Sequence, residues 1–456
     1  MGVVAWVTTA RGWYEGEHML RKKWAVACTV VAMSALAACG ESGGDVASDP
    51  TTGASAGASA AGSGETFKIG VFGPEQIPQG EDVRDGALLA AKELNAKGEG
   101  PQVEIVFCDS EAKPEKAIAC ITKFAQQDKV QAISGGFSSA ETLAILDTVK
   151  RAKLPYVSAG AAAPDVVKGV DSTGPGKYIF RIGPVNSLNL AADMCLTVTT
   201  KLTKEGFSKF GILHEDAAFA LPLVEFLNAC LPNPSAATKG AIPAAVKGVE
   251  LVGTEKHTPA ATDFSAQFKS LKDKGADFVI EVNSTQVGIQ LGKQWATLKP
   301  GFALGGINVS GQSSAYFDVT KAVGELNGPA GIVRAAVSEK TIPFFDAFMA
   351  EYKRDPLYNG AATYDGIYAL HEAAARAGAL DADTLVTELE KTDRVGVSGV
   401  EKFNEQHDVI YSATDPKAGL SLLYFQYQAD GSKKIVYPES LADGNTYQAP
   451  PGVTLP

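Results

Sequence analysis

Two adjacent serines stand where a parallel sheet could offer a site for an anion. Ser138 and Ser139 follow the strand-like run Val130–Ser134 and precede a helical pattern that begins near Glu141. A hydroxyl group and the unpaired backbone N–H groups at a helix start can hold a carboxylate. A serine in this place can also be an ordinary helix N-cap without a ligand. The pair is therefore a candidate carboxylate site, with the purely structural role as the alternative.

Patterns typical of catalysis are missing from the sequence. It contains no G-x-S-x-G or H-E-x-x-H motif and no phosphate-binding loop, and His214, His257, His371 and His407 are far apart. His214 ends an expected strand, but a structural role is the better interpretation. We therefore expect no enzyme, no cofactor and no metal site, and an exported small-molecule hydrolase is a less favoured alternative.

The N-terminal segment predicts export. The basic cluster Arg21-Lys22-Lys23 precedes an apolar run, Trp24–Leu36, which is followed by Ala37-Ala38-Cys39. This order resembles a bacterial lipoprotein signal, in which the cysteine is acylated and becomes the first mature residue. The apolar run is shorter than the roughly 20 residues that cross a bilayer. A plain secretory signal is the main alternative.

We expect residues 1–38 to be the signal peptide, with translation starting at Met19, directly before the basic cluster. Residues 39–65 contain the lipidation site Cys39 and a stretch rich in Gly, Ser, Ala and Thr that cannot bury a core. This stretch is expected to be a flexible tether. The protein is then exported and lipid-anchored to the outer face of the cytoplasmic membrane.

Charge and length restrict the possible partners and the number of domains of the mature chain. The 456 residues carry a net charge of −11, and residues 1–38 contain four basic and two acidic residues, so the mature chain is at −13. An acidic surface disfavours nucleic acid as a partner. No second apolar run approaches 18 residues, so membrane contact is expected only through the lipid. The length suits two globular domains.

Four cysteines remain after export and anchoring: Cys108, Cys120, Cys195 and Cys230. In an exported protein they suggest two disulfides, for which three pairings are possible. The pairing local in sequence is Cys108–Cys120 with Cys195–Cys230, and buried free thiols are the alternative. A zinc site is not expected, because no CxxC pair or nearby histidine accompanies them.

Strands and helices alternate along the mature chain in two successive runs. The first run has strands near 67–72, 103–107, 130–134 and 155–158, and the second has strands near 210–214, 249–253, 278–282 and 303–306. Helical spacing of apolar residues lies between the strands in both runs. Such alternation predicts an α/β protein with two doubly wound lobes around a ligand cleft.

Several stretches resemble one known family in their order and spacing: Phe67–Val71, Asp85–Ala91, Gly136–Ser139, Ala163–Asp165, Thr262–Ser265, Gly275–Val279 and Tyr364-Asp365. The chain resembles the solute-binding proteins of branched-chain amino-acid ABC transporters, the leucine/isoleucine/valine-binding family. The resemblance implies the type I periplasmic-binding fold. We expect a monomer. We expect one lobe over 66–183 plus 313–396, and the other, with a tail, over 184–312 plus 397–456.

The resemblance also implies a set of site residues. Ser138, Ser139, Gly160 and Ala162 would hold the ligand carboxylate, Phe219 would form an apolar wall, and the ring of Tyr364 would lie against the ligand; core packing is the alternative for Tyr364. A ligand in this place agrees with the rule that open α/β sheets bind ligands beyond the carboxyl ends of their strands.

One departure from the family bears on the ligand. The glutamate that usually meets the amino group is replaced by Ile307-Asn308, and a buried ammonium needs a negative charge nearby. Glu281, Glu215, Asp216 and Asp365 are possible replacements. Asn283 and Asn308 would instead suit a neutral polar ligand. An amino acid, an amide or a small carboxylic acid all remain candidates.

The function that these features imply is a lipid-anchored receptor of an ABC importer. Its lobes would close over a small molecule and deliver it to a permease. A ligand sensor of the same fold is the alternative, because fold alone does not separate transport from sensing.

Overall fold

The computed structural model describes residues 66–170, 173–240, 242–329, 332–412 and 415–454. The predicted signal peptide, Cys39 and the tether lie outside the described residues. Within these ranges, no helix combines the length and apolarity that a membrane crossing requires.

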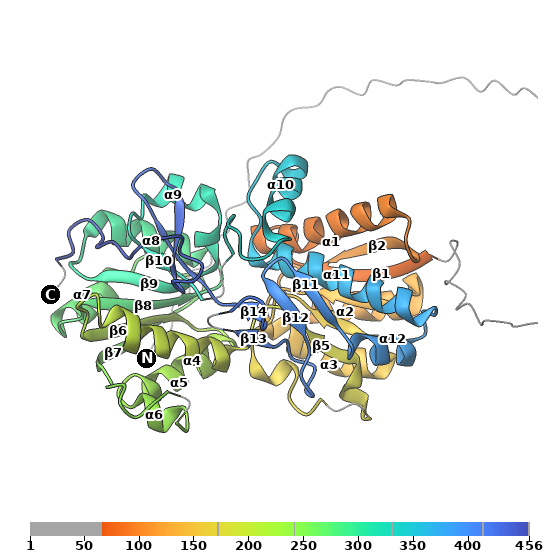
Figure 1. The fold of residues 1–456 in the computed structure, drawn as a ribbon, viewed down its shortest axis with the longest axis horizontal. Coiled ribbons are helices and arrows are strands. Elements are labelled where there is room, and N and C mark those ends of the chain that lie inside the picture. The colour runs from red at the N-terminus through yellow and green to blue at the C-terminus, as the bar shows by residue number, and fades with distance from the viewer. Residues whose placement is uncertain (1–65, 171–172, 241, 330–331, 413–414, 455–456) are drawn as a thin grey trace, which may run out of the picture. The chain divides into compact units, whose positions relative to one another are not determined.

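The first lobe is built on a five-stranded parallel sheet in the order β2-β1-β3-β4-β5 (Figure 1). Its strands are β1 (Thr66–Gly73), β2 (Gln102–Asp109), β3 (Ala132–Gly135), β4 (Tyr156–Ser158) and β5 (Ile179–Arg181). Its helices are α1 (Pro78–Lys97), α2 (Pro114–Lys123), α3 (Ser139–Ala152), α11 (Tyr358–Ala377) and α12 (Ala382–Leu389).

Both faces of this sheet are apolar, because side chains on both sides of its strands are hydrophobic. Ile69 and Val71 of β1 pack in the core beneath α1 and α11, whereas Phe72 packs in a separate core with α2 and α3. Because successive strand residues point to opposite faces, a strand covered on both sides is apolar almost throughout. All of these side chains are fully buried.

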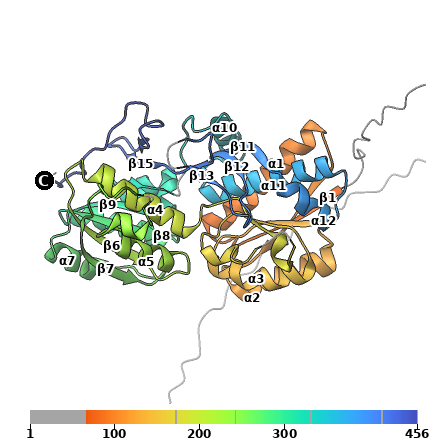
Figure 2. The same cartoon turned by 60° about the horizontal axis from the view of Figure 1, so that its bottom comes forward.

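The second lobe repeats this strand order and extends it. Its sheet runs β16-β15-β10-β9-β8-β6-β7, parallel from β7 to β10, with β15 antiparallel to β10 and to β16 (Figure 2). The strands are β6 (Lys209–Glu215), β7 (Glu250–His257), β8 (Phe278–Asn283), β9 (Ala303–Asn308), β10 (Leu326–Asn327), β15 (Tyr424–Tyr427) and β16 (Lys433–Tyr437). The helices are α4 (Ser187–Thr197), α5 (Ala220–Cys230), α6 (Pro234–Ala237), α7 (Ser265–Asp273), α8 (Val287–Leu298) and α9 (Ser314–Thr320). The two doubly wound lobes predicted from the sequence are therefore present.

The predicted lobe boundary between residues 312 and 313 is misplaced. The strand β10 pairs with β9 inside the second sheet, so the second lobe continues to at least Asn327. The chain returns to the first lobe only after this strand, where α10 (Thr341–Tyr352) packs against α1. A two-residue strand leaves no periodic pattern in the sequence, which explains the error.

A small third sheet also crosses the predicted boundary at residues 396 and 397. It runs β11-β12-β14-β13, formed by β11 (Asp393–Gly396), β12 (Gly399–Lys402), β13 (Tyr411–Ser412) and β14 (Leu420–Ser421). It is joined to the first lobe by a buried ion pair, in which Arg181 of β5 meets Asp408 at 2.7 Å.

Two disulfides join the predicted pairs. Cys108 at the end of β2 is bonded to Cys120 of α2, with Cα atoms 5.7 Å apart. Cys195 of α4 is bonded to Cys230 of α5, with Cα atoms 6.2 Å apart. The pairing local in sequence is thus confirmed, and each bond fixes neighbouring elements within one lobe.

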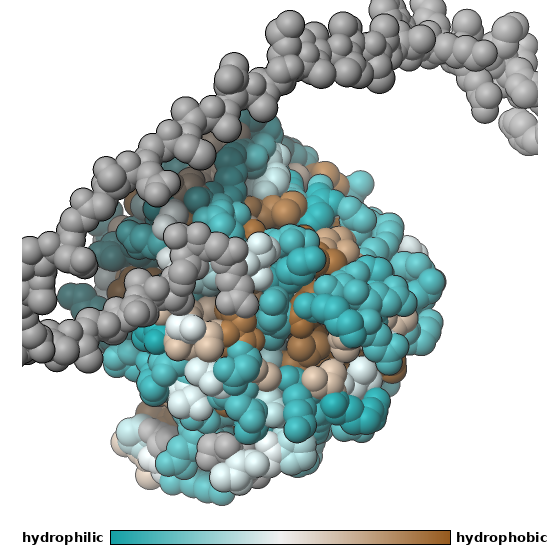
Figure 3. All heavy atoms as spheres, turned by 90° about the vertical axis from the view of Figure 1, so that its right-hand side faces the viewer, coloured by the Kyte–Doolittle hydropathy of each residue, from teal (hydrophilic) through white to brown (hydrophobic). Residues whose placement is uncertain are grey.

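The face of the molecule drawn in Figure 3 is largely hydrophilic, with hydrophobic side chains in small separate patches.

Candidate functional site

The strand order places a crevice at the same point of both lobes. In each sheet the first strand lies between the second and the third, as in β2-β1-β3 and β7-β6-β8. The loops that leave neighbouring strands at this point diverge to opposite faces, and ligands bind in the crevice that they leave. A cavity of about 390 Å³ lies here, between loops of the two lobes.

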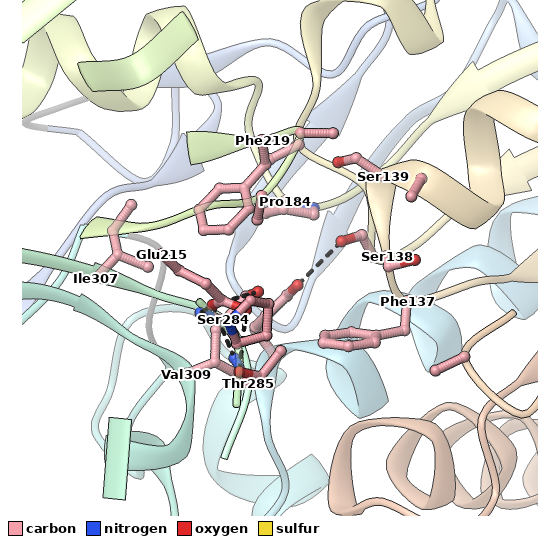
Figure 4. Close-up of a pocket in the computed structure, with 18 of the residues that line it drawn as sticks. Phe137, Ser138, Ser139, Pro184, Glu215, Phe219, Ser284, Thr285, Ile307 and Val309 are labelled. Carbon is pink, nitrogen blue, oxygen red and sulfur yellow. Dashed lines mark hydrogen bonds between the residues drawn. The ribbon is translucent and has the colours of Figure 1, made fainter. Parts of the chain in front are cut away.

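Residues that follow the strands form most of the cavity wall (Figure 4). From the first lobe come Ile77, Ala112, Phe137, Ser138, Ser139, Ala140, Gly160, Ala162, Pro184 and, from α11, Tyr358. From the second lobe come Leu190, Glu215, Asp216, Ala217, Ala218, Phe219, Pro259, Ser284, Thr285, Ile307 and Val309. The volume suits a small molecule.

The start of α3 supplies the polar side of the first lobe. Ser138 is the N-cap: its Oγ accepts from the N–H of Glu141 at 3.2 Å and donates to the Glu141 carboxylate at 2.7 Å. Ser139 Oγ accepts from the N–H of Ala163 at 3.1 Å. Both hydroxyls thus have structural partners. Ser139 and Ala140 also line the cavity, and the first N–H groups of a helix, which lie at its positive end, have no partner inside it.

The loop after β4 forms a rigid wall beside α3. A Cβ on Gly160 would lie 2.1 Å from the carbonyl oxygen of Gly136, so only glycine allows these two loops to touch. The guanidinium of Arg181 donates to the carbonyl oxygens of Ala161 and Ala163, at 3.3 and 2.8 Å. These bonds hold Ala162 between them in place.

The second lobe contributes a fixed negative charge. Glu215 ends β6 and is only 1% exposed. Its carboxylate accepts from the N–H of Ser284 at 2.8 Å, the hydroxyl of Ser284 at 3.2 Å, the N–H of Thr285 at 3.4 Å and the hydroxyl of Thr285 at 3.0 Å. These four hydrogen bonds fix the position of the carboxylate.

The other charges near the cavity are arranged differently. Asp216 also lines the cavity, but its carboxylate is paired with Lys256 at 3.0 Å. No Lys, Arg or His is found among the described residues that line the cavity. His214, directly before Glu215, has its pKa lowered by burial, which favours the neutral ring. The cavity is therefore negative on its second-lobe side.

Apolar side chains cover the rest of the wall. Phe137, Pro184, Phe219, Ile307 and Val309 line this apolar part, with Pro184 drawn beside Phe219 and Phe137 apart from them (Figure 4). Tyr358 adds its ring, while its hydroxyl donates to the carbonyl oxygen of Gly160 at 3.0 Å. The arrangement can hold a small molecule with an apolar body, a cationic group at Glu215 and an anionic group at the start of α3.

Five of the predicted ligand-binding residues line this one cavity: Ser138, Ser139, Gly160, Ala162 and Phe219. Of the four carboxylates considered as an ammonium partner, Glu215 and Asp216 line it as well. Asp365 does not line it and is instead paired with Arg394 at 3.0 Å. Glu281 is fully buried away from it, and burial raises its pKa well above the usual range.

Asn283, Asn308 and Tyr364 do not line the cavity. The amide of Asn308 donates to the hydroxyl of Tyr316 at 3.1 Å and to Glu325 at 3.2 Å, within the second lobe. Its neighbours Ile307 and Val309 face the cavity instead, so Asn308 lies on the opposite side of the chain.

Asn283 and Tyr364 also form hydrogen bonds outside the cavity. Asn283 donates to Glu281 at 2.9 Å, and both side chains are fully buried. The hydroxyl of Tyr364 donates to Glu93 at 2.6 Å, between α11 and α1. Tyr364 is therefore packed between these two helices, which was the alternative to contact with the ligand.

Several wall residues were missed from the sequence, among them Ser284, Thr285, Ile77, Pro184 and Tyr358. Ser284 and Thr285 directly follow β8, so the rule about carboxyl ends could have found them. Tyr358 comes from a helix far along the chain, and no local signal indicates it.

No group of three or more Asp, Glu, His or Cys side chains suited to a metal ion occurs in the described part of the chain.

Comparison with known proteins gives one family over most of the chain. The model of the family described as "Periplasmic binding protein" matches residues 66–413. The Leu/Ile/Val-binding protein homolog 8 of Brucella melitensis biotype 1 is 25% identical over 382 residues, which cover 80% of this chain and 87% of that protein.

Solved structures show the same fold. The branched-chain amino acid transporter substrate-binding protein LivJ of Streptococcus pneumoniae, in complex with isoleucine, has a TM-score of 0.64 at 22% identity and covers 82% of this chain and 100% of its own. A solute-binding protein from R. palustris, in complex with benzoate, has a TM-score of 0.65 at 17% identity and covers 83% of this chain and 100% of its own. The type I periplasmic-binding fold is thereby confirmed.

Proposed function

Because the chain belongs to the periplasmic binding protein family, we propose that it is an extracytoplasmic solute-binding lipoprotein that captures an apolar α-amino acid and delivers it to an ABC permease. The observation that carries the proposal is the position of Glu215. Its fixed carboxylate faces a largely apolar cavity whose other side is the start of α3 (Figure 4). A zwitterion with an apolar side chain matches this arrangement of charges.

The charges decide between the candidate ligands. An amino acid places its ammonium at Glu215 and its carboxylate at the first N–H groups of α3, so both charges are compensated. A small acid without an amino group leaves Glu215 buried and unpaired beside it. A neutral amide uses neither charge fully. The ligands named for the relatives, isoleucine and benzoate, include one molecule of the favoured class and one acid.

A panel of related molecules tests this choice. A ligand that binds only the native state at a hundred times its Kd stabilises it by about 2.7 kcal/mol. We expect leucine, isoleucine, valine or phenylalanine to raise the melting temperature. 4-Methylpentanoate lacks the ammonium of leucine and 3-methylbutylamine lacks its carboxylate, so both should leave it nearly unchanged. A rise with benzoate or 4-methylpentanoate, and none with any amino acid, would reject the amino-acid ligand.

The proposed membrane anchor rests on Leu36-Ala37-Ala38-Cys39. Acylation of Cys39 would keep the receptor beside its permease, while residues 40–65 let the lobes reach into solvent. Expressed in a bacterium, the wild-type protein should partition into the detergent phase, and Cys39→Ser should remain in the aqueous phase. Equal partitioning of both proteins would contradict the anchor without affecting the ligand.

A further inference from the structure

One buried polar side chain connects the two lobes beside the cavity without lining it. Gln79 lies in the first turn of α1, directly after Pro78, and is fully buried. Its amide donates to the carbonyl oxygen of Ser284 at 3.1 Å and accepts from the amide of Gln286 at 3.4 Å. Both partners follow β8 of the second lobe. A first-lobe side chain thus has its two polar partners in the other lobe.

The partner of Gln79 is also the partner of the site carboxylate. Ser284 donates its N–H and its hydroxyl to Glu215, while its carbonyl oxygen accepts from Gln79. The peptide segment 284–286 is therefore held between Gln79 on one side and Glu215 on the other. The segment that fixes Glu215 therefore has one of its supports in the first lobe.

We propose that Gln79 is a positioning residue that couples the approach of the lobes to the placement of Glu215 against the ligand. This inference rests on the proposed function, because it concerns the same site. When the lobes separate, water replaces both bonds of Gln79, and the segment after β8 loses one of its supports. When the lobes meet, the bonds form again and the segment holds Glu215 toward the ligand.

The chemistry of an amide suits this position. A glutamine can donate to a carbonyl oxygen and accept from an amide at once, which no charged or apolar side chain of similar size does. Leucine at residue 79 would leave the Ser284 carbonyl without its donor only when the lobes meet. A buried polar group that loses its hydrogen-bond partner destabilises the form in which it is buried. The cost falls on the closed form, in which the lobes meet, rather than on the fold of either lobe.

The test uses Gln79→Leu with Gln76→Leu as a matched control. Gln76 is exposed, lies three residues earlier, and hydrogen-bonds Asp109 of its own lobe. We expect Gln79→Leu to raise both the Kd and the dissociation rate of the bound amino acid about tenfold. Gln76→Leu should change them less than twofold. The melting temperature of both ligand-free variants should stay close to that of the wild-type protein.

Two outcomes separate this inference from the proposed function. If the wild-type protein binds an amino acid and the two variants release it equally fast, the coupling role of Gln79 is wrong and the proposed function stands. If the wild-type protein binds no amino acid, the proposed function fails. Gln79 is then judged by small-angle X-ray scattering of the ligand-free proteins. A larger radius of gyration for Gln79→Leu than for Gln76→Leu supports the coupling, and equal radii overturn it.

Discussion

Replacing Glu215 by glutamine removes one charge from the cavity wall and changes little in side-chain volume. Opposite unit charges about 4 Å apart attract by about 4 kcal/mol at an effective dielectric constant of 20. Desolvation of the ammonium and the carboxylate offsets part of this gain. We therefore expect Glu215→Gln to weaken binding of an apolar amino acid by about 3 kcal/mol, or roughly a hundredfold in Kd.

The hydrogen bonds of Glu215 predict a second, smaller effect. Its two carboxylate oxygens accept from Ser284 and Thr285 only, through four bonds. Glutamine keeps one oxygen and places an NH₂ group against donors on the other side. Unmatched donors cost about 1–3 kcal/mol. The melting temperature of ligand-free Glu215→Gln should therefore fall, and it has to be measured beside the affinity.

Isothermal titration calorimetry with leucine and with 4-methylpentanoate separates the charge effect from the loss of structure. Glu215→Gln should weaken leucine, whereas 4-methylpentanoate has no ammonium to lose and should bind the variant no more weakly than it binds the wild-type protein. Asp216→Asn is the control, since Asp216 lines the same cavity but is paired with Lys256. A Glu215→Gln protein that binds leucine within threefold of wild type would refute the assignment of the ammonium to Glu215.

Three further predictions concern stability. Burial raises the pKa of Asp193 to about 7, so the folded protein holds this proton more tightly than the unfolded chain, whose aspartates ionise near pH 4. This stabilisation by protonated Asp193 is full below about pH 4 and is lost as the pH rises to about 7. In urea unfolding, the free energy of unfolding of Asp193→Asn minus that of the wild-type protein should grow by roughly 2–4 kcal/mol between pH 4.5 and 8. A difference that stays constant over this pH range would contradict the prediction. Replacing Cys195 and Cys230 by alanine should lower the free energy of unfolding by about 4 kcal/mol, and replacing Cys108 and Cys120 should lower it by about 3 kcal/mol. The first disulfide costs more to lose because it joins residues 35 apart in sequence, whereas the second joins residues 12 apart. Guanidinium unfolding that gives the reverse order would contradict this. Arg181→Met should cost about 3–5 kcal/mol because it leaves Asp408 buried without its cation, and a melting temperature equal to that of wild type would show that the pair is not needed.

Local patterns were sufficient to predict most of the strands and helices, although not β5 or α4. Runs such as Phe278–Ile280 are apolar because both faces of a parallel sheet are covered, and this leaves a clear signal. The short strands β10, β13 and β14 leave none, since two residues have no period. The crossover between the lobes was misplaced for this reason.

The site was predictable where a strand ends directly at it. Ser138, Ser139 and Phe219 follow strands by a few residues, and all three line the cavity. The direction of a side chain is harder to predict: Asn308 lies between two wall residues but points the other way. The ammonium partner was left open among four carboxylates, because choosing Glu215 requires the position of β6 beside β8.

Native mass spectrometry of the protein purified from an expression host tests the central claim most directly. The account predicts a co-purified mass equal to that of an apolar α-amino acid on the wild-type protein and on Asp216→Asn, and its loss from Glu215→Gln. A retained mass that belongs to an acid without an amino group, or an amino acid that stays equally bound to Glu215→Gln, would contradict it.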